Sequence, residues 1–201
     1  MNSVLVSIQP RWCDLIIQGK KTIEIRKSKP KIETPFKCFI YCTKDKKLTL
    51  WKSKKYIYAD DRCHNSGDVN CNGMIIGEFV CDEIRGCRVP PRVFEHHLNK
   101  AILEESCLSF DELYKYAGEQ IAFAWSISKL KIYKHPLDIS AAVVEGDCDC
   151  MKCRKCYWAD PGNGYNVEDD CNLGYSKKEL KPLFVAPQSW CYVEEVGEDV
   201  N

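Results

Sequence analysis

The chain has 201 residues, of which 45% are hydrophobic and 11% aromatic, enough for one domain with a sizeable core and an appendage, or for two small domains. Basic and acidic residues are equal at 29 each, and this neutrality argues against strong, non-specific duplex binding driven by counterion release. No run approaches the roughly 20 apolar residues of a membrane span, and the first residues do not resemble a signal peptide, so we expect a cytoplasmic protein with no membrane association.

The first third of the chain predicts a short helix between strands. Pro10 suits the first turn of a helix over residues 10–18, and Gly19 suits the left-handed cap that ends it. The two prolines of residues 29–35 indicate a loop. Strands are predicted over residues 4–9, 22–27, 36–43, 47–52 and 55–60, the last two as a lysine-rich hairpin.

The strand predicted over residues 22–27 (TIEIRK) has an unusual pattern. Successive side chains of a strand face opposite sides, so Thr22, Glu24 and Arg26 would form one polar row. The isoleucines between them would face a core. The polar row is either the solvated face of an amphipathic strand or part of a site.

The middle and end of the chain add further strands and two helices. Residues 93–106 can form one helix, and Ser109 with Glu112 makes a capping box for another, which Gly118 stops. Further strands are predicted over residues 74–84, 120–133 and 189–196, and we expect Pro136 to end the second of them. Many short strands with a few flanking helices, in a non-alternating order, predict an α+β fold around a small mixed β-barrel, closed or partly closed.

Charge is distributed unevenly along the chain. Residues 1–60 carry 14 Lys and Arg against 5 Asp and Glu, a balance of +9, residues 61–137 carry 9 against 11, and residues 138–201 carry 6 against 13. A basic first third that contains Trp12 and Trp51 suits a polyanion such as nucleic acid. The alternative is that the lysines only keep strand faces and loops soluble.

The chain has 14 cysteines, many for a cytoplasmic protein. A disulfide framework is not expected, because the cytosol keeps thiols reduced. Cys38, Cys42 and Cys81 lie in apolar, strand-like runs and are interpreted as small buried hydrophobes. Cys63, His64 and Cys71 form a weak cluster in a loop, for which we favour an ordinary structural role over metal binding.

Five further cysteines crowd into an acidic stretch, residues 145–182, which we interpret as an insertion before the last strand. They are Cys148, Cys150, Cys153, Cys156 and Cys171. Their knuckle-like spacing predicts a structural zinc site that uses four of the five, and zinc would supply folding energy to a segment with few apolar residues. A reduced segment without metal, a redox pair and an iron–sulfur cluster are the alternatives. Four thiolates would leave no open position for catalysis.

Gly19, Lys21, Glu24 and Arg26 together resemble the G-x-K-x-x-E-x-R signature of the ASCH domain family, part of the PUA-like superfamily. An early strand and a tryptophan-bearing helix precede the motif, as in the family. Other resembling segments are IIGEFV at 75–80, AWSISKLKIY at 124–133 and the P-x-S-W-C-Y strand at 187–192. The resemblance implies a PUA-like barrel domain over residues 1–140 and 183–197, interrupted by the zinc-binding insertion over 145–182.

The resemblance also implies a cleft beside the motif that binds RNA or a nucleotide. Gly19 would make the turn, and Lys21, Glu24 and Arg26 would line the cleft, joined by Thr22 and Trp12 as ligand contacts. Lysine and arginine can meet phosphate, and a carboxylate can accept hydrogen bonds from a base. Trp12 or Trp125 could stack a base, although packing in the core is the ordinary role of each.

Two alternatives to ligand binding fit the same residues. Lys21 and Glu24 could share proton transfers in a hydrolase that acts on RNA or on a modified nucleoside. One amidohydrolase branch of the family has a threonine nucleophile where this chain has Glu24, which is a departure from that branch. Alternatively, Glu24 forms a salt bridge with Arg26 or a lysine that stabilises the fold and binds nothing. No protein partner can be inferred from the sequence.

Overall fold

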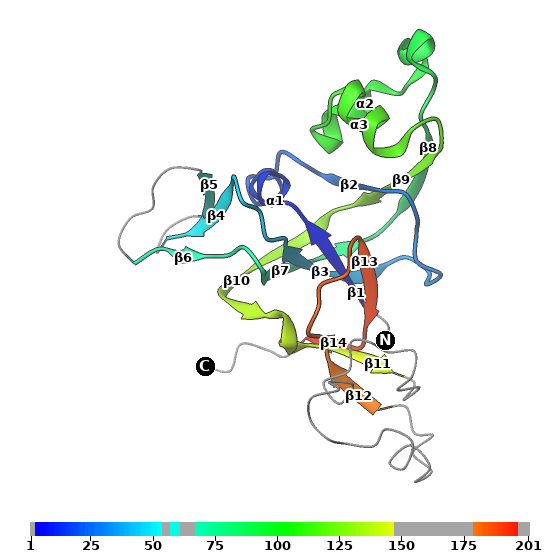
Figure 1. Cartoon of the computed structure of the whole chain (residues 1–201). Coiled ribbons are helices and arrows are strands. Elements are labelled where there is room, and N and C mark those ends of the chain that lie inside the picture. The colour runs from blue at the N-terminus through cyan, green and yellow to red at the C-terminus, as the bar shows by residue number, and fades with distance from the viewer. Residues whose placement is uncertain (1–2, 54–56, 61–66, 147–178, 197–201) are drawn as a thin grey trace, which may run out of the picture.

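The computed structural model describes residues 3–53, 57–60, 67–146 and 179–196 (Figure 1). The helical segments are α1 (Pro10–Ile17), η1 (Arg92–His97), α2 (Lys100–Ser106), α3 (Phe110–Ala117) and η2 (Ile139–Ala141). The strands are β1 (Ser3–Ile8), β2 (Ile23–Arg26), β3 (Phe36–Cys42), β4 (Thr49–Lys52), β5 (Ile57–Asp60), β6 (Val69–Asn70), β7 (Met74–Cys81), β8 (Ile84–Arg88), β9 (Ile121–Ser126), β10 (Ser128–Asp138), β11 (Ala142–Gly146), β12 (Glu179–Pro182), β13 (Trp190–Val193) and β14 (Glu195–Val196). Strands predominate, and the predicted α+β class is confirmed.

The largest sheet has five strands in the order β10-β7-β3-β1-β13. Strand β1 pairs parallel to β3 and antiparallel to β13, with Ser3 opposite Val193. All six residues of β1 are buried, as expected for an inner strand covered on both faces. The late strand of the sequence therefore returns to the first one, as Figure 1 shows.

The other described strands form three-stranded sheets, in the orders β2-β9-β8, β5-β4-β6 and β12-β11-β14. A barrel, closed or partly closed, was expected, and among the described residues no sheet closes on itself, so no closed barrel is found. Two predicted long strands each bend, and the two halves of each belong to different sheets. Strand β7 belongs to the five-stranded sheet, and β8, which follows it, belongs to the β2-β9-β8 sheet. Strand β9 belongs to the β2-β9-β8 sheet, and β10, which follows it, belongs to the five-stranded sheet.

The chain bends between β7 and β8 and again between β9 and β10, and Ser126 connects these two bends by hydrogen bonds. The Ser126 hydroxyl accepts hydrogen bonds from the backbone amides of Asp82 and Glu83, both at 2.9 Å, and the Ser126 amide donates to the Glu83 carbonyl at 3.0 Å. The bend after β7 is thereby fixed to the bend between β9 and β10. A corner made by such long-range contacts explains why the predicted strands over 74–84 and 120–133 are each interrupted.

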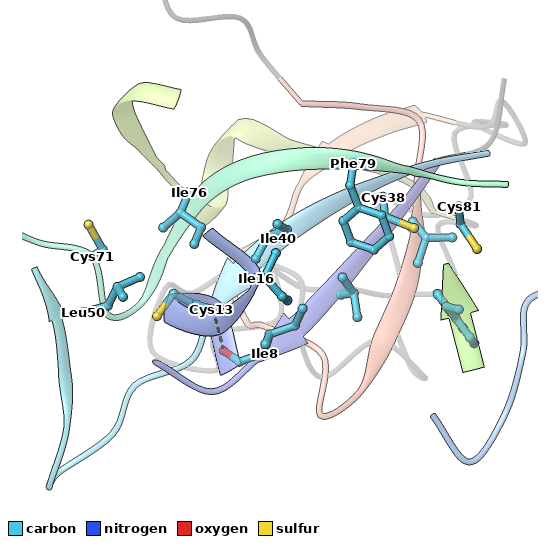
Figure 2. Packing of buried hydrophobic residues seen from close by; sticks show 14 of the residues in the cluster. Ile8, Cys13, Ile16, Cys38, Ile40, Leu50, Cys71, Ile76, Phe79 and Cys81 are labelled. Carbon is cyan, nitrogen blue, oxygen red and sulfur yellow. Dashed lines mark hydrogen bonds between the residues drawn. The ribbon is translucent and has the colours of Figure 1, made fainter. Parts of the chain in front are cut away.

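Helix α1 packs on the five-stranded sheet and closes a hydrophobic core between them, which we call the first core. It begins at Pro10 and is followed by Gly19, whose φ of 69° is the left-handed conformation predicted for the cap. Cys13 and Ile16 lie between the helix and the sheet residues Ile40 and Ile76 (Figure 2). The Cys13 thiol donates to the Ile8 carbonyl at 3.5 Å.

The buried cysteines of this core are packing residues, as predicted. Cys38, Cys42, Cys71 and Cys81 are all 0% exposed. Burial raises the pKa of the Cys71 thiol to about 12 and that of Cys81 to about 11, so both stay protonated near neutral pH. Cys63 and His64, the other members of the weak cluster, lie outside the described residues.

A second core lies between the β2 sheet and helices α2 and α3, which cover it at one end of the molecule (Figure 1). Ile23 and Ile25 of β2 face this core. Helix α3 begins with the predicted capping box of Ser109 and Glu112 and is followed by Gly118. The single helix expected over 93–106 is divided into η1 and α2, because the Asn99 side chain accepts from the Ala101 amide and caps a new helix.

Pro136 does not end its strand, contrary to expectation. Strand β10 continues to Asp138, and its pairing with β7 shifts register between Ile132 and Leu137. Strand β10 lies at the edge of its sheet, where a residue without an amide proton is tolerated.

The five clustered cysteines at 148–171 lie outside the described residues, but the strands that flank them are described. Strand β11 pairs antiparallel with β12, with Gly146 opposite Glu179. The two ends of the cysteine-rich segment therefore meet. The division into domains and the zinc site stay predictions, and no cluster of three metal-ligating side chains exists within the described ranges. No described helix is long and apolar enough to cross a membrane.

Candidate functional site

The predicted motif begins at the turn between α1 and β2. The Gly19 amide donates to the Ile16 carbonyl at 2.9 Å, and the Lys20 and Lys21 amides donate to the Leu15 carbonyl at 2.9 and 3.1 Å. This turn lets the chain leave the helix and enter β2 at once. Gly19 makes the turn that the resemblance implied.

Glu24 lies at the centre of a buried group of three charges, which we call the motif network (Lys21, Glu24 and Arg26). Lys21 Nζ lies 3.3 Å from Glu24 Oε2, and Arg26 Nη2 lies 3.0 Å from Glu24 Oε1. The three side chains are 2%, 9% and 7% exposed. The polar row of β2 is therefore not a solvated strand face. Two cations around one anion leave the network with one net positive charge.

The two cations also bind backbone carbonyls from distant parts of the chain. Lys21 Nζ donates to the Ser106 carbonyl of α2 at 2.8 Å. Arg26 Nη2 donates to the Ser7 carbonyl of β1 at 2.6 Å. Arg26 Nη1 donates to both the carbonyl and the hydroxyl of Ser189, just before β13, at 3.3 Å. The motif network thus joins the β2 segment to β1, to α2 and to the residue before β13. The salt bridges expected by the purely structural interpretation are present.

Trp12 and Thr22, the other predicted ligand contacts, lie differently. Trp12 of α1 is half-buried, with Arg11 Cζ 4.4 Å and Lys21 Nζ 5.2 Å from the ring centroid, so it lies next to the motif network. Thr22 is exposed and precedes β2. Its amide donates to the Glu105 carbonyl at 2.8 Å, and its carbonyl accepts from the Ile127 amide at 2.9 Å. Thr22 shares the surface with the site but not the network.

Trp125 is a core residue. It lies opposite Glu24 in the β2–β9 pair, is 0% exposed, and contacts the rings of Phe36 and Trp190 at centroid distances of 5.8 Å each. It is not available to stack a base. Three buried polar atoms of this region have no hydrogen-bond partner within the described part of the chain: Glu24 Oε2, Arg26 Nε and Trp125 Nε1. The region keeps unused donor and acceptor capacity beneath the surface.

Comparison with known proteins identifies the family. The family model of the ASCH domain matches residues 6–136, which include the whole motif network. The chain belongs to the ASCH domain family. No curated protein sequence matches it.

Three solved structures of ASCH proteins from Zymomonas mobilis are similar to this ASCH domain. The first is 19% identical, covers 68% of this chain and 73% of its own, and has a TM-score of 0.45. Two mutant proteins from the same organism are each 18% identical and cover 68% of this chain, with TM-scores of 0.45 and 0.44, and 76% and 73% of their own chains are covered.

Sequence reasoning missed several residues around the site of this ASCH domain. Ser7 and Ser106 contribute backbone carbonyls, which no side-chain pattern could reveal. Ser189 was visible as part of the final strand motif, but not as a partner of Arg26. Tyr116 of α3 lies close by, where partial burial raises the pKa of its phenol and the Arg26 guanidinium opposes part of that rise.

Since the motif network is buried, the outer surface of the site is formed by its neighbours. Lys20 and Lys27 are exposed at the two ends of the segment that carries the network, Thr22 is exposed between them, and Gly19 is exposed just before Lys20. Neither lysine has an ion-pair partner among the residues that the structure describes. A ligand that approaches the ASCH motif therefore first meets unpaired positive charge.

Proposed function

We propose that this ASCH domain binds RNA or a nucleotide at the surface beside the motif network. The observation that carries the proposal is the charge of residues 19–31, which contain six Lys and Arg residues and one acid, Glu24. Because Glu24 is already engaged by Lys21 and Arg26, no acidic side chain of this segment opposes an approaching phosphate. A local surplus of positive charge attracts polyanions and raises their rate of association.

Trp12 supports the same function. Its ring is half-buried beside two cations, Arg11 and Lys21. Stacking on an aromatic ring together with phosphate contacts from neighbouring basic side chains is how proteins commonly hold unpaired bases. Arg11 also forms an ion pair with Glu112 of α3 at 3.0 Å, at the surface. The Trp12 ring itself packs against the first core, which restricts its position.

The motif network supports binding by fixing the backbone of β2. A buried ion pair held by hydrogen bonds on both sides has few alternative geometries. Through Ser7, Ser106 and Ser189 the network locks β2 against its neighbours, so the exposed residues at its ends keep fixed positions. We therefore assign Glu24 and Arg26 a positioning role in ligand binding.

One observation favours a hydrolase as the second candidate function. Lys21 Nζ and the Glu24 carboxylate are 3.3 Å apart, close enough to share proton transfers. In RNA cleavage one group would take the proton of the attacking 2′-hydroxyl and the other would give a proton to the departing 5′-oxygen. Both side chains are almost fully buried, so this function requires a movement that brings substrate to them.

One time course tests both functions. The protein and its Lys20→Gln and Glu24→Gln variants are mixed with end-labelled single-stranded RNA, and free, bound and shortened RNA are resolved together. We expect a shifted, intact band with the unmodified protein and a weaker shift with Lys20→Gln, because an exposed cation is lost without disturbing the fold. Circular dichroism and thermal melting show whether each variant is folded.

The other outcomes are equally informative. RNA shortened by the unmodified protein but not by a folded Glu24→Gln variant would assign the hydrolase function instead. If neither RNA nor a panel of mononucleotides binds, the proposed function is wrong and the motif network serves stability alone.

A further inference from the structure

The loop between β2 and β3 carries three lysines that the motif does not include. Lys27, Lys29 and Lys31 are all exposed, and they are separated by the exposed Ser28 and the buried Pro30. The loop begins directly after Arg26, so the first of these lysines lies next to the motif network in the chain. We call residues 27–31 the lysine loop.

The lysine loop is anchored to the protein by its intervening residues. Pro30 is buried, and Ile32, just beyond the loop, packs against the first core. Trp190 Nε1 donates to the Ser28 hydroxyl at 3.1 Å, and the Lys31 amide donates to the Tyr192 hydroxyl at 2.6 Å. Both aromatic residues belong to β13. An anchored loop loses less conformational entropy when it binds a ligand than a free one does.

Aromatic rings lie under two of the three lysines. Lys27 Nζ is 5.1 Å from the centroid of the Tyr116 ring, and Lys29 Nζ is 5.9 Å from that of Phe123. A cation above an aromatic ring is attracted by the quadrupole of the ring. An ion pair, in contrast, would occupy N–H donors of the ammonium group. Each ammonium therefore keeps donors for an oxyanion while its position is restricted.

The charges of the lysine loop are not neutralised by neighbours. Within the described ranges none of its three lysines has an ion-pair partner. The nearest acid along the loop, Glu33, lies beyond its end and is exposed. Unpaired cations close to exposed and half-buried aromatic rings are the features by which proteins bind the backbone and bases of a single nucleic-acid strand.

We propose that the lysine loop contacts successive phosphates of a polynucleotide that passes the motif network, so that the ligand of this site is an RNA strand and not a free nucleotide. A mononucleotide offers its phosphate at one place, whereas three cations at alternate positions of an anchored loop can meet several phosphates along a strand. This inference rests on the proposed function and specifies its ligand.

The test compares two triple variants that lose the same charge. In the first, Lys27, Lys29 and Lys31 are replaced by Gln. In the matched control, the exposed Lys44, Lys46 and Lys47 of the loop between β3 and β4 are replaced by Gln. Affinity for uridine monophosphate and for a single-stranded oligouridylate of twelve nucleotides is measured by fluorescence anisotropy competition over a series of salt concentrations.

We expect the unmodified protein to bind the oligouridylate at least tenfold more tightly than the mononucleotide. The lysine-loop variant should lose about tenfold or more of the oligouridylate affinity, and its slope of log affinity against log salt should fall by about 2, since each phosphate contact to a single strand contributes about 0.7. Mononucleotide affinity should change less than about twofold, and the control variant should behave like the unmodified protein.

Two results would overturn the inference while the proposed function stands. One is equal affinity for the mononucleotide and the oligouridylate. The other is an equal loss of oligouridylate affinity in both triple variants, which would show a non-specific effect of net charge. If the unmodified protein binds neither probe, the proposed function fails, and the inference fails with it.

Discussion

Glu24 of β2 lies directly opposite Trp125 of β9, so the carboxylate at the centre of the motif network is the cross-strand neighbour of a fully buried indole. Opposed residues of an antiparallel pair bring their Cβ atoms to about 5 Å. A large apolar ring at this distance excludes water from one side of the carboxylate. The two ion pairs of Glu24 therefore act in a low-dielectric environment, where losing a partner is costly.

Replacement of Glu24 by Gln should strongly destabilise the protein. It keeps the shape of the side chain but leaves the buried cations Lys21 and Arg26 without their anion. Removing one partner of a buried ion pair costs about 3–5 kcal/mol, and we expect a loss of this size in the free energy of unfolding, measured with urea. The exposed Glu33→Gln variant is the control and should change stability by less than about 0.5 kcal/mol. A small effect of Glu24→Gln would mean that the cations find other partners.

Arg26 and Ser189 should contribute unequally to stability. Arg26→Met removes the ion pair with Glu24 and three hydrogen bonds at once, and we expect it to cost about 3 kcal/mol or more. Ser189→Ala removes only a hydroxyl acceptor and leaves the Ser189 carbonyl in place, so it should cost about 1 kcal/mol. Equal costs in urea unfolding would show that the hydroxyl, and not the guanidinium, organises this contact.

Acid should weaken the start of helix α3 through Glu112. The backbone amide of Ser109 donates to this carboxylate and lowers its pKa in the folded state. A carboxyl group with a lowered folded-state pKa stabilises the fold above its unfolded-state pKa of about 4.3, and this contribution is lost as the pH falls through the folded-state value. Thermal melting between neutral and acidic pH should therefore show a smaller acid-induced loss in Glu112→Gln, which keeps the capping geometry but does not titrate. Parallel pH profiles would contradict the assignment.

The cysteine-rich segment should hold zinc. Protein purified under reducing conditions without chelator should contain about one zinc per chain, held by four of the five cysteines at 148–171. Elemental analysis of Cys153→Ser should show a clear loss of metal, whereas Cys107→Ser, a described free thiol outside that segment, should retain it. Metal-free unmodified protein that is folded would exclude the site.

Local signals in the sequence predicted local structure well. Pro10 and Gly19 set the two ends of α1, and Ser109 with Glu112 set the start of α3, because caps and turns depend on neighbours in the chain. The bend at Asp82–Glu83 could not be predicted in the same way. Its partner, Ser126, is more than forty residues away, at sequence separations of 44 and 43.

The candidate site was predicted only in part, again because some of its contacts come from residues far away in the sequence. The spacing of Lys21, Glu24 and Arg26 identified the motif and its polar row. It could not show that these three side chains are buried, because the groups that satisfy the two cations are mainly backbone carbonyls, those of Ser7, Ser106 and Ser189. Carbonyls are carried by every residue and leave no signature in a sequence.

The contact between Arg26 and Ser189 has a consequence for how the site is made. These residues are 163 positions apart, so on the ribosome Arg26 emerges long before the segment that completes its coordination. Until β13 docks beside β1, two of the acceptors of the Arg26 guanidinium are missing and β2 is not fully held. The site is thus complete only once the segment that contains Ser189, Trp190 and Tyr192 has been synthesised, and until then the lysine loop lacks two of its anchors.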